Sequence, residues 1–238
     1  SIVSHELKTP LLAVQQNLYA ILEGIVGDLN PAQRDMLERI KNRIDALLRM
    51  IKTWVEMTSM DTRQVKEKFK PLDVPSIVAR AVEILQPQAS ARNVDISLRS
   101  PASTEPVSGD EGTLLEVFTN IIGNAIKFSH AGGQVSIKIE DRVADLHISV
   151  CDNGVGIEKQ DLPFIFDAFY QGKARGKDGE PGSGLGLAIS SRIINAHNGS
   201  ISVESEPGRG STFTVILARG IRKEPADVDA DAAAHFLI

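Results

Sequence analysis

Two asparagines and a lysine form the first group of residues whose types and spacing could do chemistry. Asn120, Asn124 and Lys127 are four and three residues apart, which places them on one face of a helix. Amide oxygens are hard ligands that suit Mg²⁺, and a nearby lysine can contact phosphate oxygens. The pattern therefore indicates a magnesium and phosphate site. The alternative is a solvated polar stripe.

A second candidate is the segment DNGVGI, which follows a strand-like run of alternating apolar residues. The run fixes Asp152 at a strand end, where its carboxylate can accept a hydrogen bond from an exocyclic amine such as that of adenine. Gly154 and Gly156 would let the backbone approach a planar ligand closely. Taken alone, the segment is also compatible with an ordinary glycine turn.

A third candidate is GSGLGLAIS, which places Gly182, Gly184 and Gly186 at the start of a predicted helix. Backbone N–H groups at a helix N-terminus favour phosphate through geometry and dipole. The segment resembles a dinucleotide-binding fingerprint only superficially, because no βαβ unit precedes it. The glycine-rich, basic stretch ahead of it is interpreted as a lid that could close over a triphosphate, or as a flexible surface loop.

The candidate nucleophile is a histidine near the N-terminus. The segment SHELKTPL places His5 beside Glu6 at the start of a long amphipathic helix. A neutral imidazole is nucleophilic near neutral pH, and a neighbouring carboxylate can orient it and take its proton. A lone histidine more often has a structural or solvated role. The other histidines, none with a neighbouring acid on such a helix, are His130, His147, His197 and His235.

Two helices must position His5. Within the first 60 residues, apolar side chains recur four and three apart, which is a heptad seam. Between the two runs, Asn30 is a predicted N-cap and Pro31 the first helical residue. Because a lone hairpin leaves much of its apolar stripe in water, we expect a homodimer that forms a four-helix bundle. The seam comprises Leu7, Leu11, Val14, Leu18, Ile21 and Ile25, then Leu37, Ile40, Ile44, Leu47, Ile51 and Trp54.

The nucleotide-binding candidates belong to a second region, which follows a polar linker at residues 61–70. Helical and alternating patterns succeed one another there and predict an α/β sandwich, a mixed sheet with helices on one face. The acidic tail from Ile221 is expected to be disordered or loosely docked. The expected helices are 75–91, 112–128 and 185–196, and the expected strands are 94–98, 134–140, 145–151, 200–204 and 211–217.

Bulk composition excludes several function classes. The 238 residues, 42% hydrophobic and 24% charged, suffice for one large or two modest domains. A net charge of −5 argues against nucleic-acid binding. A single cysteine, Cys151, excludes an intrachain disulfide and fits the reducing cytoplasm. No apolar run could span a bilayer, so we expect a membrane link only through an N-terminal segment missing from this chain, which we interpret as a fragment of a longer parent.

In this order, the segments resemble the N, G1, F, G2 and G3 boxes of sensor histidine kinases of two-component systems. The matching stretches are NIIGNAIKFS, DNGVGI, FIFDAFYQG, GSGLGLAIS and EPGRGSTF, and SHELKTPL is similar to the H box. The resemblance implies an α+β protein, with a Bergerat-type ATP fold shared with gyrase, mismatch-repair and chaperone ATPases. It also implies a dimerisation and phosphotransfer domain at 1–66 and a catalytic ATP-binding domain at 67–220, which leaves the acidic tail at 221–238 outside both domains.

The resemblance also implies roles for single residues. Asn124 would be the Mg²⁺ ligand, with Asn120 and Lys127 near the phosphates of ATP. Asp152 would bind the adenine amine. Where many members carry Arg, this chain has Gln171. The remaining expected contacts are Gly154 and Gly156 around adenine, Phe166 and Phe169 at the lid base, Gly182, Gly184, Leu185 and Gly186 near the phosphates, Thr212 closing the adenine side, and Lys173 or Arg175 in place of the missing arginine.

The implied activity is ATP-dependent phosphorylation of His5, with Glu6 orienting the ring, then transfer to an aspartate of a response-regulator receiver domain. Thr9 would orient water for dephosphorylating the regulator, or simply pack beside Pro10. A plain ATPase or ATP-driven clamp of the same superfamily generally has a glutamate where this chain has Asn120. A nucleotide-binding scaffold without activity would need a damaged box, and none is seen. Phosphorylation within or between protomers remains open.

Overall fold

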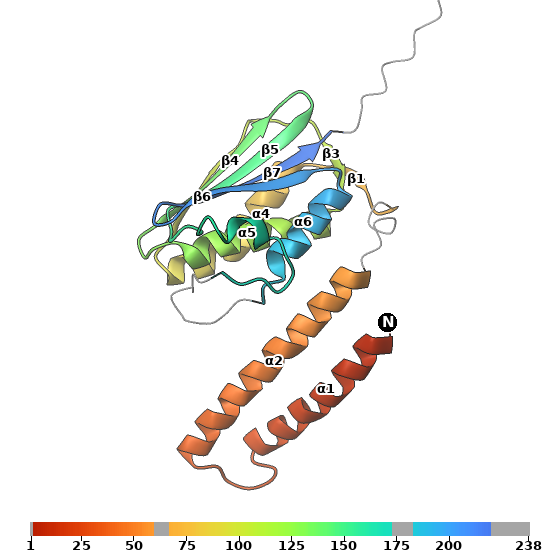
Figure 1. Cartoon of the computed structure of the whole chain (residues 1–238), viewed down its shortest axis with the longest axis vertical. Helices are drawn as coiled ribbons and strands as arrows, with labels where there is room; N and C mark the ends of the chain where they lie inside the picture. The colour runs from red at the N-terminus through yellow and green to blue at the C-terminus, as the bar shows by residue number, and fades with distance from the viewer. Residues whose placement is uncertain (1, 60–66, 173–182, 220–238) are drawn as a thin grey trace, which may run out of the picture.

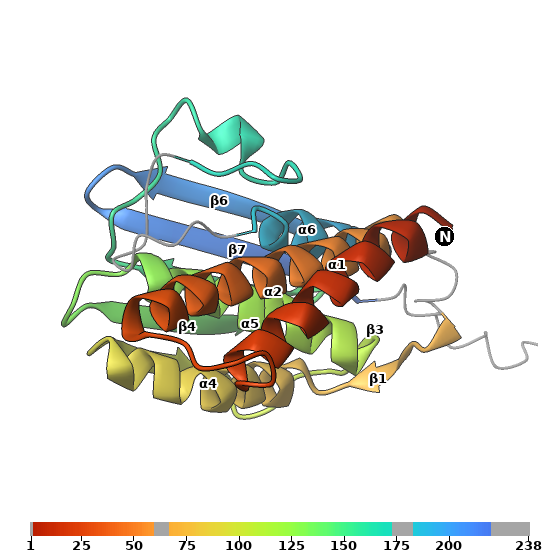
Figure 2. The same cartoon turned by 90° about the horizontal axis from the view of Figure 1, so that it is seen from below.

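A helical hairpin and an α/β sandwich make up the computed structural model of the chain (Figure 1), which describes residues 2–59, 67–172 and 183–219. For residues 2–9, 46, 49–50 and 52–59 it describes the backbone only. The hairpin consists of α1 (Ile2–Leu22) and α2 (Pro31–Ser59), which run side by side (Figure 2). None of the helices in these ranges has the length and apolar character that crossing a bilayer requires.

The turn of the hairpin is closed by local hydrogen bonds. The Asn30 side chain accepts from the Gln33 N–H at 2.9 Å, and the Gln33 side chain accepts from the Asn30 N–H at 3.0 Å. This reciprocal capping box confirms Asn30 as the N-cap and Pro31 as the first helical residue. At the other end, α1 stops before Ile25, whose N–H bonds back to the Ala20 carbonyl. Ile25 is 77% exposed, so its assignment to the helical seam is wrong.

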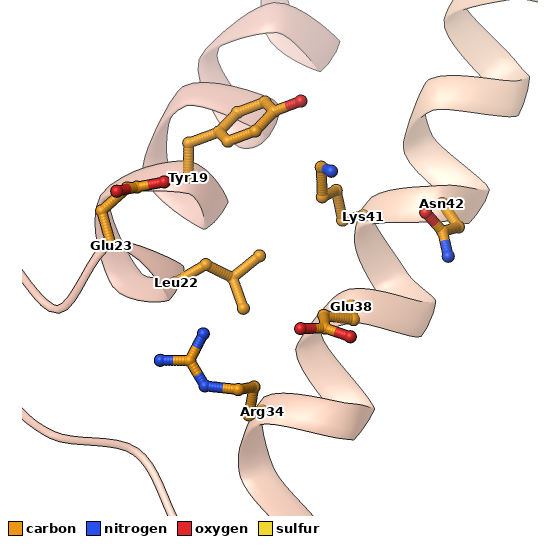
Figure 3. A pocket seen from close by; sticks show the side chains of 7 residues that line it. All are labelled: Tyr19, Leu22, Glu23, Arg34, Glu38, Lys41 and Asn42. Carbon is orange, nitrogen blue, oxygen red and sulfur yellow. The ribbon is translucent and has the colours of Figure 1, made fainter. Parts of the chain in front are cut away.

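The seam itself is only half covered within one chain. Leu18 and Ile44 are buried, whereas Val14 and Leu47 are each 47% exposed. Near the turn, the two helices leave a cavity of about 250 Å³ (Figure 3). Lys41 lies over the Tyr19 ring there, with its nitrogen 5.1 Å from the ring centre. The hairpin thus leaves apolar side chains in water, as the sequence pattern predicts.

The sandwich contains a five-stranded mixed sheet in the order β2-β4-β5-β7-β6. Only β2 and β4 pair in parallel. Helices α4, α5 and α6 cover one face (Figure 1), which confirms the predicted architecture. Each predicted element is present within two residues of its expected bounds. These are α4 (Val74–Ala91), β2 (Asp95–Arg99), α5 (Glu111–Phe128), β4 (Gln134–Asp141), β5 (Asp145–Asp152), α6 (Gly186–Ala196), β6 (Ser200–Glu206) and β7 (Gly210–Ala218).

The polar linker was expected to run into a first strand, and β1 (Lys70–Leu72) confirms this, but its partner strand and the small second sheet that they form were not expected. This sheet pairs β1 with β3 (Val107–Gly109) in antiparallel register. Strands of three residues are too short to establish an alternating pattern. A short 3₁₀ helix, η1 (Leu162–Phe164), lies in the long loop between β5 and α6.

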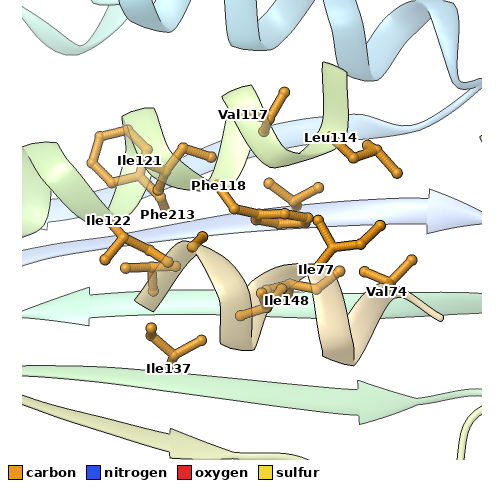
Figure 4. Packing of buried hydrophobic residues seen from close by; sticks show 14 of the residues in the cluster. Val74, Ile77, Leu114, Val117, Phe118, Ile121, Ile122, Ile137, Ile148 and Phe213 are labelled. Atoms are coloured by element: carbon orange, nitrogen blue, oxygen red, sulfur yellow. The ribbon is translucent and has the colours of Figure 1, made fainter. Parts of the chain in front are cut away.

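The core lies between the sheet and its helices (Figure 4), with α5 at its centre. Phe118, Val117 and Ile121 lie at different angles around α5, yet all are fully buried. The buried side of α5 is therefore wide. A face of Leu115, Phe118, Ile122 and Ile126 was expected from the sequence, and of these only Leu115 is partly rather than fully buried. Burying each such side chain stabilises the folded state by roughly 1.5–3 kcal/mol relative to leaving it exposed. This burial holds α5 rigidly against the sheet.

His197 closes the C-terminal end of α6 and is buried. Its Nε2 accepts a hydrogen bond from the Asp110 N–H at 3.0 Å, and its Nδ1 donates to the Ile193 carbonyl at 2.8 Å. The ring also stacks on Phe69, with centroids 4.6 Å apart. One neutral imidazole therefore joins the end of α6, the start of α5 and the residue that precedes β1.

Candidate functional site

Helix α5 positions the polar residues that were expected to contact phosphate. Asp110 caps the helix, accepting a hydrogen bond from the Thr113 N–H at 2.8 Å. Asn120, Asn124 and Lys127 are all partly exposed on this helix. Lys127 lies near its C-terminus, with its nitrogen 5.4 Å from the Phe128 ring centre.

The two asparagines differ in their surroundings. The Asn120 amide nitrogen donates to the Ser190 hydroxyl of α6 at 2.8 Å. In the part of the chain that the structure describes, the Asn124 side chain has no hydrogen-bond partner, so its amide oxygen is available to a ligand. Those described residues also contain no cluster of three or more His, Cys, Asp or Glu side chains that could hold a metal. A magnesium ion here would thus be held by Asn124 together with substrate oxygens and water.

Asp152 ends β5 with a buried carboxylate, 4% exposed. Its Oδ1 accepts a hydrogen bond from the Gly154 N–H at 2.9 Å, and the Ser211 N–H is a further donor. Burial raises the pKa of the Asp152 carboxyl, while these two amides and His130 oppose the rise. A buried acceptor with remaining hydrogen-bonding capacity suits an amine of a flat, largely apolar ligand.

The glycines beside Asp152 are required by the protein's own backbone. A Cβ on Gly154 would lie 2.1 Å from the Phe128 carbonyl oxygen. Gly156 has φ +68°, and a Cβ there would lie 2.1 Å from the Glu206 carbonyl oxygen. The Val155 N–H also donates to Phe128 at 3.1 Å. The two glycines therefore join the end of β5 to α5 and to β6, and whether they also contact adenine stays a prediction.

The register of β5 and β7 corrects one expected contact. Asp152 is opposite Ser211, and Cys151 is opposite Thr212. Because side chains alternate along a strand, Thr212 lies on the outer face of the sheet while Asp152 and Ser211 share the inner face. Thr212 therefore cannot close the adenine side. Ser211, which is buried, was missed, although counting back from Phe213 would have placed it inward.

The segment before α6 packs against the end of the long loop. The Phe166 side chain packs on the core. Phe169 is exposed, but its N–H donates to the Gly184 carbonyl at 2.8 Å. Leu185 is fully buried, so only its backbone could face a ligand. Gly182, Lys173 and Arg175 lie outside the described residues.

A cavity of about 240 Å³ lies between α5 and the start of α6. Gly186 borders it, and a Cβ on this residue would lie only 2.2 Å from the Asn120 amide oxygen. The absence of a side chain at Gly186 thus makes room for Asn120. The polar lining comes from Glu116, Thr119 and Asn120 on α5 and from Ser183 and Ser190.

The expected nucleophile lies on the other part of the molecule. His5, Glu6 and Thr9 are all in α1, and α1 continues through Pro10. His5 and Thr9 are four residues apart on this helix and so share a face. Their side chains lie outside those that the structure describes.

Two family models match adjoining parts of the chain. "Histidine kinase-, DNA gyrase B-, and HSP90-like ATPase" matches residues 109–221, which include α5, Asp152 and α6. The fold and the site thus define an ATP-binding domain of this class. "His Kinase A (phospho-acceptor) domain" matches residues 1–63, which contain the hairpin. The chain belongs to the sensor histidine kinases of two-component systems.

Individual relatives agree with this assignment. The "Sensor-like histidine kinase SenX3" of Mycobacterium tuberculosis is 35% identical over 216 residues, which are 90% of this chain and 52% of SenX3. The chain thus spans about half the length of this relative. Full-length ShkA in complex with AMPPNP has a TM-score of 0.71 and 27% identity, over 92% of this chain and 45% of ShkA. ThkA in complex with the response regulator protein TrrA shares the fold, with a TM-score of 0.65 and 19% identity over 92% of this chain and 63% of ThkA.

Proposed function

We propose that this protein phosphorylates itself on His5 with ATP and passes the phosphoryl group to an aspartate of a response-regulator receiver domain. The arrangement around α5 carries the proposal. Asp152 adjoins the C-terminal end of α5 through Gly154, and the start of α6 adjoins Asn120. A buried acceptor and a cavity lined largely by polar residues thus lie along one helix, which supports a ligand with an amine-bearing base at one end and phosphates at the other. We further propose that residues 1–66 form the dimerisation and phosphotransfer domain, 67–220 the catalytic domain and 221–238 a tail.

ATP binding is assigned to groups with distinct tasks. Asp152 accepts a hydrogen bond from the adenine amine, and Ser211 replaces Thr212 beside it. Lys127 contacts phosphate, and the N-terminal turn of α6 offers backbone N–H groups to it. The open amide of Asn124 suits Mg²⁺, which when bound neutralises charge on the transferred phosphoryl group.

The chemical step uses the His5 imidazole as the nucleophile. A ring nitrogen forms a bond to the γ-phosphorus, and the bond from that phosphorus to the β–γ bridging oxygen breaks, releasing ADP. Glu6 orients the ring and takes the proton that the imidazole loses. The phosphohistidine then donates its phosphoryl group to the carboxylate of the regulator.

The surroundings of Asn120 favour transfer over simple hydrolysis. An amide is not a base, and this one already donates to Ser190. Water activation by residue 120, as in a plain ATPase, is thus disfavoured. Thr9 could still orient water against the phosphorylated regulator, which would give a second, phosphatase activity.

The assembly we propose is a homodimer acting in the cytoplasm on a receiver domain. The half-covered seam, in which Val14 and Leu47 are exposed, supports a second hairpin as its cover. A regulator partner agrees with the family and with the complex that ThkA forms with TrrA.

The test is incubation of the purified chain with γ-labelled ATP and Mg²⁺, comparing wild type with His5→Gln and with the control His147→Gln, which alters the face of β5 opposite to Asp152. Acid-labile, base-stable label in wild type and control, and none in His5→Gln, is the expected result. Label that persists in His5→Gln would move the nucleophile elsewhere. Phosphate release without any label would favour the plain ATPase.

A further inference from the structure

A buried carboxylate lies in the long loop between β5 and α6, outside the residues assigned to ATP. Asp161 is 8% exposed and accepts a hydrogen bond from the Tyr170 hydroxyl at 2.9 Å. The chain then passes close to the same carboxylate, since a Cβ on Gly172 would lie 3.1 Å from Asp161 Oδ2. The Tyr170 ring also contacts Phe164, with centroids 5.6 Å apart. The loop therefore closes on Asp161.

The residue next to Tyr170 is held in a strained conformation. Phe169 has φ +67°, which costs energy for any residue except glycine and persists only where surrounding contacts impose it. One such contact is its N–H, which donates to the Gly184 carbonyl at 2.8 Å. Gly184 packs so closely that a Cβ on it would lie 2.7 Å from the Phe169 carbonyl carbon. The bond between Tyr170 and Asp161 fixes the other side of this turn.

These contacts connect the Tyr170–Asp161 pair to the backbone at the start of α6, which is assigned to the phosphates of ATP. Gly184 lies two residues before Gly186, the first residue of α6. We propose that Tyr170 and Asp161 form a latch that positions the start of α6 for the phosphates of ATP. Both are positioning residues. The inference rests on the proposed function, because it assigns a task at the same nucleotide site.

The latch predicts a specific split of kinetic effects. Its loss loosens the backbone that meets ATP but leaves the reacting groups intact. Tyr170→Phe removes only the hydroxyl and is expected to raise the Kd and KM for ATP about 3- to 10-fold, with kcat changed by less than about twofold. Asp161→Ala should raise the Kd at least as much. The double variant Tyr170→Phe/Asp161→Ala should bind ATP no more weakly than Asp161→Ala alone, because both changes break the same hydrogen bond. Asp161→Asn keeps an acceptor for the hydroxyl and should bind within about twofold of wild type.

The experiment measures binding of a fluorescent methylanthraniloyl ATP with Mg²⁺ to the full chain, alongside KM, kcat and the thermal midpoint. Tyr19→Phe is the matched control, since the chain has two tyrosines and Tyr19 lies in the hairpin. Binding by Tyr170→Phe at the wild-type Kd would overturn the latch. So would weakened binding by Asp161→Asn equal to that of Asp161→Ala. Failure of the wild type itself to bind the probe would overturn the proposed function instead.

Discussion

The side-chain amide of Asn120 donates a hydrogen bond to the hydroxyl of Ser190, 2.8 Å away across the contact between α5 and α6. Ser190 is almost fully buried, so water does not compete for this bond. The bond fixes Asn120 between the two helices that border the polar cavity. It also distinguishes the role of Asn120 from that of Asn124, whose side-chain amide has no partner among the described residues and is available to a ligand.

Replacing Ser190 with alanine should therefore affect both stability and activity. The Asn120 amide would lose its partner, at a cost of about 1–3 kcal/mol, and autophosphorylation should fall about 3- to 10-fold. Labelled phosphate incorporation and thermal melts measure the two effects. Ser191→Ala is the control, because Ser191 is half-buried and adjacent. Equal activity of the two variants would contradict the role given to Ser190.

Asp152→Asn should separate stability from ligand binding. Because burial raises the pKa of Asp152, its charged form destabilises the folded state at neutral pH. The neutral amide should give an equal or higher thermal midpoint. Its NH₂ would face the adenine amine, so ATP affinity should fall by about tenfold or more, or about 1.4 kcal/mol. Calorimetry with ATP measures both. Glu158→Gln, an exposed change in the same loop, should alter neither quantity.

His197 should make the catalytic domain sensitive to mild acid. Burial lowers the pKa of the His197 imidazole, although the Ile193 carbonyl and Asp110 oppose this shift. The unfolded chain thus takes up a proton near pH 6.5, before the folded chain does. The stability that the neutral ring provides is complete above about pH 6.5 and is lost as the pH falls toward the lowered pKa.

The check is the thermal midpoint of His197→Gln at about pH 7.5 and about pH 5.5. At the higher pH the variant should be less stable than wild type. On acidification, the thermal midpoint of the variant should fall by about 2–4 °C less than that of wild type. Ser191→Ala, a half-buried change in α6 that removes no titratable group, should keep the wild-type slope. A slope unchanged in His197→Gln would show that another group is responsible.

The exposed seam of the hairpin predicts a dimer that a single charge can weaken. Val14→Glu places a carboxylate among apolar side chains, which costs several kcal/mol when unpaired. Analytical ultracentrifugation should show dimers for wild type and monomers for Val14→Glu at micromolar concentration. Ile25→Glu alters a residue beyond the end of α1 and should remain dimeric. A monomeric wild type would contradict the bundle.

Local patterns predicted the elements well because burial on one face sets a period of two or about 3.6 residues. Long-range pairings were not predictable in this way. The partner of Asn120 lies 70 residues along the chain, and no local pattern indicates it. Thr212 was misassigned because a shift of one residue along β7 moves a side chain to the opposite face. The glycine Gly186 was expected near phosphate, but its missing side chain makes room for Asn120.

The stacking of Phe69 on His197 has a mechanical consequence. Phe69 directly precedes β1, and His197 connects the end of α6 with the start of α5. A movement of the chain that precedes Phe69 would therefore be passed to the N-terminal end of α5 and to the C-terminal end of α6. The opposite ends of these two helices flank the Asp152 loop and Gly186. Because both helices pack on the sheet, a small tilt of either helix at its His197 end would change the spacing between α5 and α6 at the other end, where the phosphates are expected to bind.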